Sequence, residues 1–316
     1  MSHAPNQYSN TDEDKRISNT ERPIQLSTPL TDLLIYTNLF LAISVTSLVF
    51  ETFILLDIKE FDFNYPLFLF CATVFLYGFH SIFKILKLDK TLLSERHVWL
   101  LKHSFIFYTI MALALVLGLF ALSHFALSFL FSLIPIIIVS LAYTLPLIPS
   151  KTKFISIRDI PGIKIFLISL VLSITTVLLP AELYKGYGSV NHFALLFVFI
   201  RRMLFIFAIT IPFDIRDVEL DKAKGTLTIP VMLGEKKAKA IALLALFVFM
   251  TLSIFDYQVM RFNNLYLLVA FIISAFISAV LLVLSNARKS DFFYALFLEG
   301  LMFVQYLLVY IAMQLK

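Results

Sequence analysis

The sequence predicts an all-α, polytopic membrane protein with nine transmembrane helices. Of its 316 residues, 60% are hydrophobic and only 15% are charged, and the mean hydropathy is +0.90. Apolar runs of about 20 residues recur along the chain, a length that crosses the hydrocarbon core as a helix. In lipid every backbone polar group must be bonded internally, and runs this uniformly apolar indicate helices rather than the alternating strands of a barrel.

The chain divides into a polar tail and a membrane domain. Residues 1–29 are polar and carry no signal-like apolar core, so we expect a disordered tail, and residues 30–316 form the nine-span domain. The third and fourth runs nearly touch, which predicts a tight hairpin. The expected spans are 31–56, 65–86, 104–123, 125–148, 163–181, 192–213, 238–256, 264–285 and 291–314.

Lysine and arginine residues are distributed unevenly between the two sides of this topology. Of 26 such residues, 20 lie in the N-terminal tail and the even-numbered loops, four lie on the other side, and two lie inside a run. Because cytoplasmic loops are enriched in these residues, the N-terminus and the loop after the sixth span are expected in the cytoplasm and the C-terminus outside. The expected location is a bacterial cell membrane.

Composition also excludes some classes of function. The formal charge of +5 does not indicate nucleic-acid binding, since the basic residues lie in loops between membrane runs. Cys71 is the only cysteine, so neither an intrachain disulfide nor a thiolate metal site can form.

Three aspartates follow the sixth run, at spacings of three and four residues. On a helix, Asp214, Asp217 and Asp221 would lie on one face about one turn apart, and like charges so placed repel. A cation is therefore expected among them, and Mg²⁺ commonly bridges one or two carboxylates to phosphate groups. The alternative is a solvated acidic helix end paired with nearby basic residues, namely Arg216, Lys222 and Lys224.

This stretch, FDIRDVELDKAKGTLTIPVMLG from Phe213 to Gly234, resembles the second aspartate-rich motif of the UbiA superfamily of intramembrane prenyltransferases. A second similarity is Tyr143 to Pro146 at the end of the fourth run, followed by a basic loop and Lys164. The similarity covers residues 30–314 in architecture but only the motif closely. The motif positions fall on Asp214, Arg216, Asp217, Glu219, Asp221, Gly225 and Thr226-Leu227.

The resemblance implies nine helices around a central cavity open to the cytoplasmic face. It implies transfer of a polyprenyl group from its diphosphate to a lipophilic, aromatic acceptor, with Mg²⁺ held by aspartate motifs after the second and sixth spans. A metal would offset the charge of the departing diphosphate, and an apolar cavity would shield the allylic cation from water. The implied metal ligands are Asp214, Asp217 and Asp221, and the implied diphosphate contacts are Lys164, Arg216, Lys84 and His80.

The first aspartate motif is missing. Between Tyr77 and His97 the chain has no Asn, its only acids are Asp89 and Glu95, and His80 and Lys84 lie where carboxylates are expected. Two hypotheses follow. Either the enzyme uses one metal on the second motif together with Lys84, Lys87 and Lys164, because lysine also binds phosphate, or the protein is a non-catalytic UbiA-fold module that binds lipid or a partner. A transporter is a third option, although the Gly/Pro-interrupted pairs of broken helices are absent.

Several polar residues in or near the runs allow two interpretations. His80 either donates to the diphosphate or bonds a neighbouring helix, and Lys164 either contacts phosphate or snorkels to the interface. Tyr143 either lines the cavity or belongs to an interfacial belt, while Arg96 and His97 are expected in an interface cluster with Trp99.

Two adjacent arginines lie inside the sixth run. Because charges at that depth are costly, we expect the span to begin near residue 198 and leave Asn191–Val198 as an interfacial segment that brings Arg201 and Arg202 close to water. Asp256 and Glu182 are expected in outer loops.

Overall fold

The computed structural model describes residues 28–87, 94–149, 154–186, 190–259 and 264–315. Most of the predicted polar tail thus lies outside the described residues. The bounds of the first half are α2 Pro29–Tyr36, α3 Leu39–Leu55, α4 Asn64–Lys87, α5 Glu95–Lys102, α6 Ser104–Leu122, α7 Leu127–Thr144, β1 Ile148–Pro149, β2 Phe154–Ile155 and the 3₁₀ turn η2 Ile157–Asp159. The second half comprises α8 Ile163–Ser173, the π-helix η3 Ile174–Leu178, α9 Leu179–Lys185, α10 His192–Arg216, α11 Val218–Lys224, α12 Ile229–Leu233, α13 Glu235–Val259, α14 Leu265–Leu284, the π-helix η5 Phe293–Glu299 and α15 Gly300–Gln314.

The described part of the chain contains eight helical segments long and apolar enough to cross a membrane, and a ninth if α2 and α3 form one bent span. The prediction of an all-α polytopic fold is confirmed, but the first run is not one straight helix. Its two parts meet at 61°, and Asn38 at the junction has a left-handed backbone (φ 66°). The Arg96 guanidinium from α5 donates a hydrogen bond to the Asn38 Oδ1 at this break.

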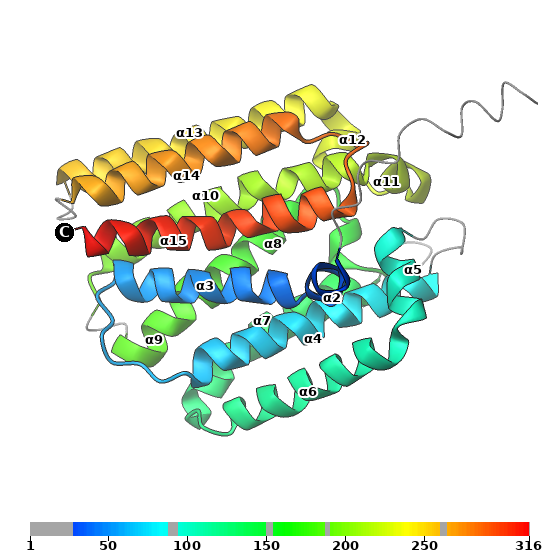
Figure 1. The fold of residues 1–316 in the computed structure, drawn as a ribbon, viewed down its shortest axis with the longest axis horizontal. Helices are drawn as coiled ribbons and strands as arrows, with labels where there is room; N and C mark the ends of the chain where they lie inside the picture. The colour runs from blue at the N-terminus through cyan, green and yellow to red at the C-terminus, as the bar shows by residue number, and fades with distance from the viewer. Residues whose placement is uncertain (1–27, 88–93, 150–153, 187–189, 260–263, 316) are drawn as a thin grey trace, which may run out of the picture.

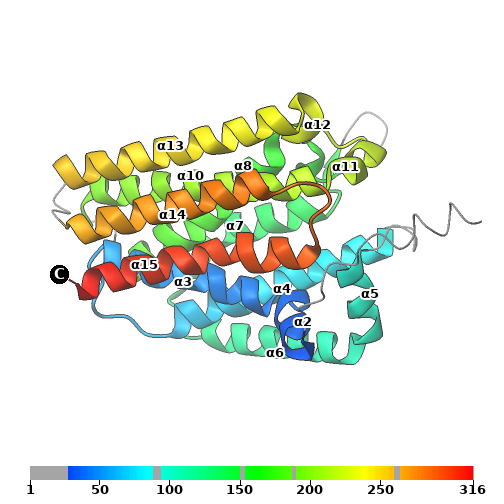
Figure 2. The same cartoon turned by 45° about the horizontal axis from the view of Figure 1, so that its top comes forward.

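The long helices lie side by side in one bundle (Figures 1 and 2). The short helices α2, α5, α11 and α12 gather at the end of the bundle opposite the C-terminus (Figure 1). Of the eight spans, α10 is the most deeply buried, and it packs against α8 and α13. Its side chains Phe205, Ile206 and Ile211 are almost fully buried because α10 is surrounded by other helices. The helix that carries the aspartate motif therefore lies in the core.

A two-residue antiparallel pair, β1 and β2, closes the loop between α7 and α8, with Ile148 opposite Ile155. The Ser156 hydroxyl then donates to the Thr144 carbonyl across 3.0 Å and fixes the loop to the end of α7. These bonds place the start of α8 beside the motif loop, because the Gly162 N–H also donates to the Leu227 carbonyl at 3.0 Å.

The expectation for the two arginines of the sixth run is wrong. The α10 helix is continuous from His192, and Arg201 and Arg202 are only 3% and 2% exposed. They form ion pairs with Asp256 of α13 at 3.1 Å and with Glu51 of α3 at 3.2 Å. Asp256 is accordingly a buried helix residue and not a loop residue. Pairing inside the bundle removes the need to reach water, which is how membrane proteins accommodate charges at depth.

Candidate functional site

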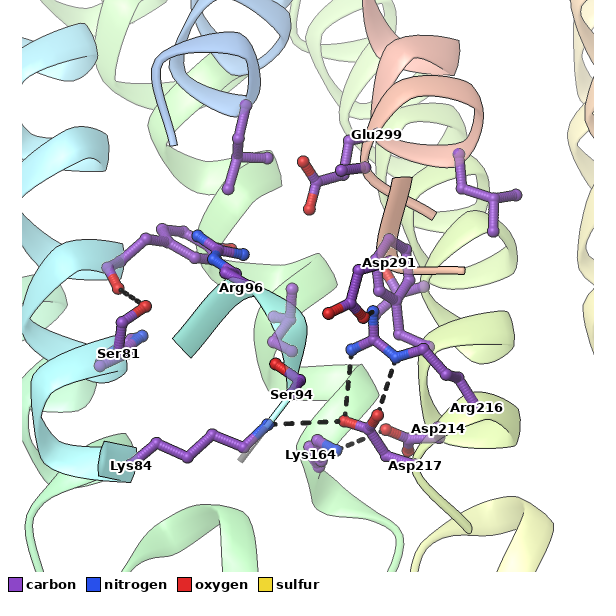
Figure 3. A pocket seen from close by; sticks show the side chains of 18 of the residues that line it. Ser81, Lys84, Ser94, Arg96, Lys164, Asp214, Arg216, Asp217, Asp291 and Glu299 are labelled. Atoms are coloured by element: carbon purple, nitrogen blue, oxygen red, sulfur yellow. Dashed lines mark hydrogen bonds and ion pairs between the residues drawn. The ribbon is translucent and has the colours of Figure 1, made fainter. Parts of the chain in front are cut away.

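A cavity of about 350 Å³ opens among the helices at the α5 and α11 end of the bundle, and its polar lining is drawn in Figure 3. Its deeper wall is apolar, with Leu41, Ile168, Ile206, Ile209 and Met302. Charged side chains of both signs line other parts of the wall. They are Lys84, Arg96, Arg158, Asp159, Lys164, Asp214, Arg216, Asp217, Asp221, Asp291 and Glu299.

The three motif aspartates all line this cavity, but they come from two helices. Asp214 lies in the last turn of α10 and is 1% exposed. Asp217 is the residue at which α10 ends and α11 begins, and Asp221 lies in α11. Gly225 ends α11 with a left-handed backbone (φ 70°), which directs the following loop back so that Thr226 also lines the cavity.

Lys164 joins two of these carboxylates. Its Nζ lies 2.6 Å from the Asp214 Oδ1 and 3.7 Å from the Asp221 Oδ2. Lys164 is the second residue of α8, and Gly162, with a left-handed backbone (φ 71°), is the N-cap of this helix. The predicted snorkelling alternative is therefore wrong, since this lysine points into the protein and not to the interface.

Asp217 is paired with two cations. The Arg216 Nε lies 2.8 Å from its Oδ1, and the Lys84 Nζ lies 3.9 Å from its Oδ2 (Figure 3). Burial opposes ionisation of Asp217, but Arg216 and Lys84 outweigh it and hold the pKa of Asp217 well below its usual range. Asp217 therefore stays an anion at neutral pH.

Arg216 connects the aspartate motif with the last span. Its Nη1 lies 3.1 Å from the Asp291 Oδ1, and its guanidinium lies over the Tyr294 ring at 4.9 Å. Arg216 thus contacts one carboxylate on each side. Because its guanidinium is planar and its N–H donors are rigidly arranged, these two contacts fix the position of the side chain.

The face of α4 opposite the motif carries no carboxylate in the cavity. His80, Ser81 and Lys84 line it instead. Glu95 is exposed and does not line the cavity, whereas Asp89 and the side chain of Lys87 lie outside the described residues. The missing first motif is thus replaced by a basic and neutral face.

His80 lies between two aromatic rings. Its ring centroid is 5.6 Å from those of Tyr77 and Tyr143, and within the described structure its buried Nε2 has no hydrogen-bond partner. A bond from the Nε2 to a neighbouring helix, which the second interpretation of His80 allowed, is therefore not seen among the described residues. Tyr143 lines the cavity, which was one of its two interpretations.

A second, apolar pocket of about 110 Å³ adjoins the cavity between α4, α7 and α8. The two share Tyr77, His80, Tyr143, Ile168 and Leu172. Leu76, Val139 and Leu167 add to its lining, so an apolar space continues from the polar chamber toward sparsely covered helix α7.

Five charged cavity residues were not predicted as site residues, namely Arg96, Arg158, Asp159, Asp291 and Glu299. Arg96, expected in an interface cluster, points into the cavity, and Asp291 and Glu299 were not considered. A carboxylate inside the last apolar run is itself a signal of function, because such residues are rare in spans. Glu299 could have been found by that criterion.

The carboxylates of the cavity are the kind of oxygen ligand that Mg²⁺ prefers. Among the described residues, no three His, Cys, Asp or Glu side chains gather closely enough to enclose a metal. Mg²⁺, however, is often held by only one or two carboxylates together with water and substrate phosphates. Asp217 and Asp221 both line the cavity, so their carboxylates could hold one such ion together with a phosphate. Helix α4 contributes Lys84 but no carboxylate to the cavity, so it offers no ligand of this kind for a second ion.

Comparison with solved structures identifies the fold. A UbiA homolog from Aeropyrum pernix K1 superposes with a TM-score of 0.57 at 14% identity, covering 91% of this chain and all of that one. A digeranylgeranylglyceryl phosphate synthase superposes with a TM-score of 0.56 at 18% identity, covering 90% of this chain and 99% of that one. No protein-family model and no curated protein matches the sequence.

The chain is thus an integral, multi-pass membrane protein with the UbiA-superfamily fold, as the motif predicted. At this level of identity the likeness defines the fold, and the function must be argued from the site itself.

Proposed function

We propose that this protein is an intramembrane prenyltransferase that moves a polyprenyl group from its diphosphate to a lipophilic acceptor. The observation that carries the proposal is the cavity, in which three aspartates and several cations meet at a polar mouth above an apolar interior. A polyprenyl diphosphate matches this cavity, because it has a charged diphosphate at one end and a long apolar tail at the other. The fold shared with a digeranylgeranylglyceryl phosphate synthase supports this assignment.

Asp217 and Asp221 would hold Mg²⁺ jointly with the diphosphate. Asp214, which is paired with Lys164, would lie beside them. When bound, the ion would offset the charge that develops on the departing pyrophosphate. Lys164, Arg216 and Lys84 would donate hydrogen bonds to the phosphate oxygens, and Lys84 would supply the positive charge that a second metal supplies elsewhere. His80, on the same wall, would add one further donor.

The tail would lie in the apolar pocket between α4, α7 and α8. Its lining residues Leu76, Val139 and Leu167 exclude water, and Tyr77 and Tyr143 stand where this pocket meets the polar chamber. Aromatic faces attract cations, so both rings would stabilise an allylic cation formed there. We propose a bacterial membrane as the location, and the excess of Lys and Arg on this side supports a cytoplasmic orientation of the chamber.

The test uses the purified protein in nanodiscs with radiolabelled geranylgeranyl diphosphate and Mg²⁺. The expected result is release of pyrophosphate together with a labelled lipophilic product when membrane lipid extract is added. Asp217→Asn should lower the rate at least about 100-fold, equivalent to ~2.7 kcal/mol. The matched control, Glu182→Gln, alters a carboxylate in α9 that is hydrogen-bonded to Ser132 and should leave the rate unchanged.

The second candidate is a non-catalytic UbiA-fold protein that binds lipid or a partner, and the basic face of α4 favours it. In that case the wild-type protein would bind the diphosphate but release no pyrophosphate under any condition. A transporter would instead move the intact diphosphate across vesicles.

A further inference from the structure

Glu299 differs from the other carboxylates of the cavity. Asp214, Asp217 and Asp291 each have a basic partner, and Asp159 accepts a hydrogen bond from the Ser156 N–H at 3.0 Å. Glu299 lines the same cavity, yet among the described residues it forms neither a hydrogen bond nor an ion pair. A carboxylate without a close partner inside a membrane span is costly unless it takes up a proton or meets a ligand, and the positive charges acting on it are those of Arg96 and Arg216.

The backbone next to Glu299 is unusual as well. Glu299 ends a π-helix of seven residues, Phe293–Glu299, at the point where α15 begins. π-helical turns are rare and frequently occur at functional sites. Gly300 follows, and a Cβ there would lie 3.3 Å from the Phe40 ring, so the absence of a side chain lets α15 approach α3 closely.

Arg96 stands across the cavity from Glu299 (Figure 3). It comes from α5, and its bond to the Asn38 side chain at the break between α2 and α3 uses one of its five N–H donors. Arg96 and Glu299 thus offer hydrogen-bond donors and an acceptor toward one space. A hydroxyl group is complementary to such a pair because it both accepts and donates.

We propose that Arg96 and Glu299 form the acceptor subsite and bind the hydroxyl group of the second, lipophilic substrate. This inference rests on the proposed prenyl transfer. Arg216 lies between the two subsites in Figure 3, paired with Asp217 on one side and with Asp291 on the side of Glu299. The acceptor hydroxyl would therefore lie next to the bound diphosphate, with Arg96 donating to its oxygen and Glu299 accepting its hydrogen.

The experiment measures pyrophosphate release in nanodiscs at saturating geranylgeranyl diphosphate, with two hydroxyl probes titrated in turn. One probe is an alkyl phenol and the other is a glycerol phosphate that carries one ether-linked prenyl chain. At least one probe should stimulate release by the wild-type protein. Glu299→Gln should then raise the KM for that probe at least about tenfold and change the Kd of geranylgeranyl diphosphate less than about twofold.

Arg96→Gln should raise the same KM, and Glu299→Asp should recover part of the loss. Glu182→Gln, the matched change at a carboxylate outside the cavity, should alter neither constant. Stimulation by neither probe in a protein that binds the diphosphate would overturn the acceptor subsite. So would an unchanged KM in Glu299→Gln, or an equal loss of diphosphate affinity. Failure of the wild-type protein to bind the diphosphate would instead refute the proposed function.

Discussion

Two groups of ion pairs in this bundle use the same residue types in different ways. Near the C-terminal end of α3, Arg202 and Glu51 form a closed pair in which each side chain is 1% exposed. At the C-terminal end of α10, Lys84 and Asp217 lie 3.9 Å apart and are 29% and 21% exposed. The first pair is enclosed by helices, whereas the second lines a cavity.

The two groups of ion pairs differ in whether a ligand could replace one of the paired side chains. Glu51 is held by Arg202 and by the Gln305 amide at 3.4 Å, and Arg202 also donates to the Leu48 carbonyl at 2.9 Å. These bonds connect α3, α10 and α15 and leave no access for a ligand. Around the cavity, in contrast, a phosphate could take over the contacts of Lys84 or Lys164. We infer that the enclosed pairs fix the packing of the bundle and the open pairs bind substrate.

The largest effect should come from breaking the enclosed pair. Arg202→Leu leaves Glu51 buried without its cation and should lower the free energy of unfolding by about 3–5 kcal/mol, measured by denaturation in detergent micelles. The double variant Arg202→Leu with Glu51→Leu should recover most of that loss. A single variant of unchanged stability that no longer binds diphosphate would contradict the division between the two groups.

A pH-dependent effect should follow from His97, which is 4% exposed and hydrogen-bonded to Ser94 at 2.7 Å. Burial, with the neighbouring charges of Lys84 and Arg96, lowers the pKa of His97 to about 4. The unfolded chain therefore binds the proton first, and stability should fall as the pH drops from about 6.5 to 4, by on the order of 2–3 kcal/mol.

The measurement for His97 is the unfolding temperature between pH 7 and pH 4. The unfolding temperature of His97→Gln should fall less across this window than that of the wild-type protein, because the variant lacks the histidine. The part of the decrease that comes from carboxylates is the same in both proteins. Identical pH profiles would show that His97 takes up its proton equally in the folded and unfolded states.

Lys164 should show the next largest effect. Lys164→Gln removes the cation that lies between Asp214 and Asp221, and the Kd of geranylgeranyl diphosphate should rise about 30-fold, or ~2 kcal/mol. The matched control is Lys185→Gln, whose Nζ donates to the Leu56 carbonyl at 2.6 Å away from the cavity. Equal losses in the two variants would point to a general structural effect.

The smallest effect should come from Lys84, which is the most exposed of these cations. Lys84→Gln should weaken diphosphate binding about three- to fivefold and should increase its dependence on Mg²⁺, because a fixed charge is lost. The measurement is the Kd of the diphosphate as a function of Mg²⁺ concentration in the wild-type protein and in Lys84→Gln. If the curves coincide, Lys84 does not substitute for a metal.

The sequence predicted the elements of this fold well, because each span is a long apolar run with polar ends. It also located the aspartate motif, whose spacing and neighbours are local features. It did not predict that α10 ends at Asp217 or that Arg201 and Arg202 are paired inside the bundle. Those outcomes depend on partners such as Glu51, which is distant in sequence and can be assigned only after the helices are packed.

The cavity wall was predicted only in part for the same reason. Lys164 was identified from its position at the start of the fifth run, after Tyr143–Pro146 and a basic loop, but Glu299 faces the cavity through a π-helix for which the sequence carries no recognised pattern. Arg96 reaches the chamber because α5 folds back over the break in the first span. The positions of Glu299 and Arg96 in the cavity depend on tertiary contacts, which the hydrophobic periodicity of the sequence does not reveal.

The most direct test of the account is equilibrium binding of geranylgeranyl diphosphate to the purified protein across a Mg²⁺ titration. Wild-type protein should bind more tightly as Mg²⁺ rises, and the double variant Asp217→Asn with Asp221→Asn should lose that dependence while it stays folded. Wild-type binding that is unaffected by Mg²⁺, or a double variant that responds to Mg²⁺ as the wild type does, would contradict the claim that these aspartates bind the ion and the diphosphate together.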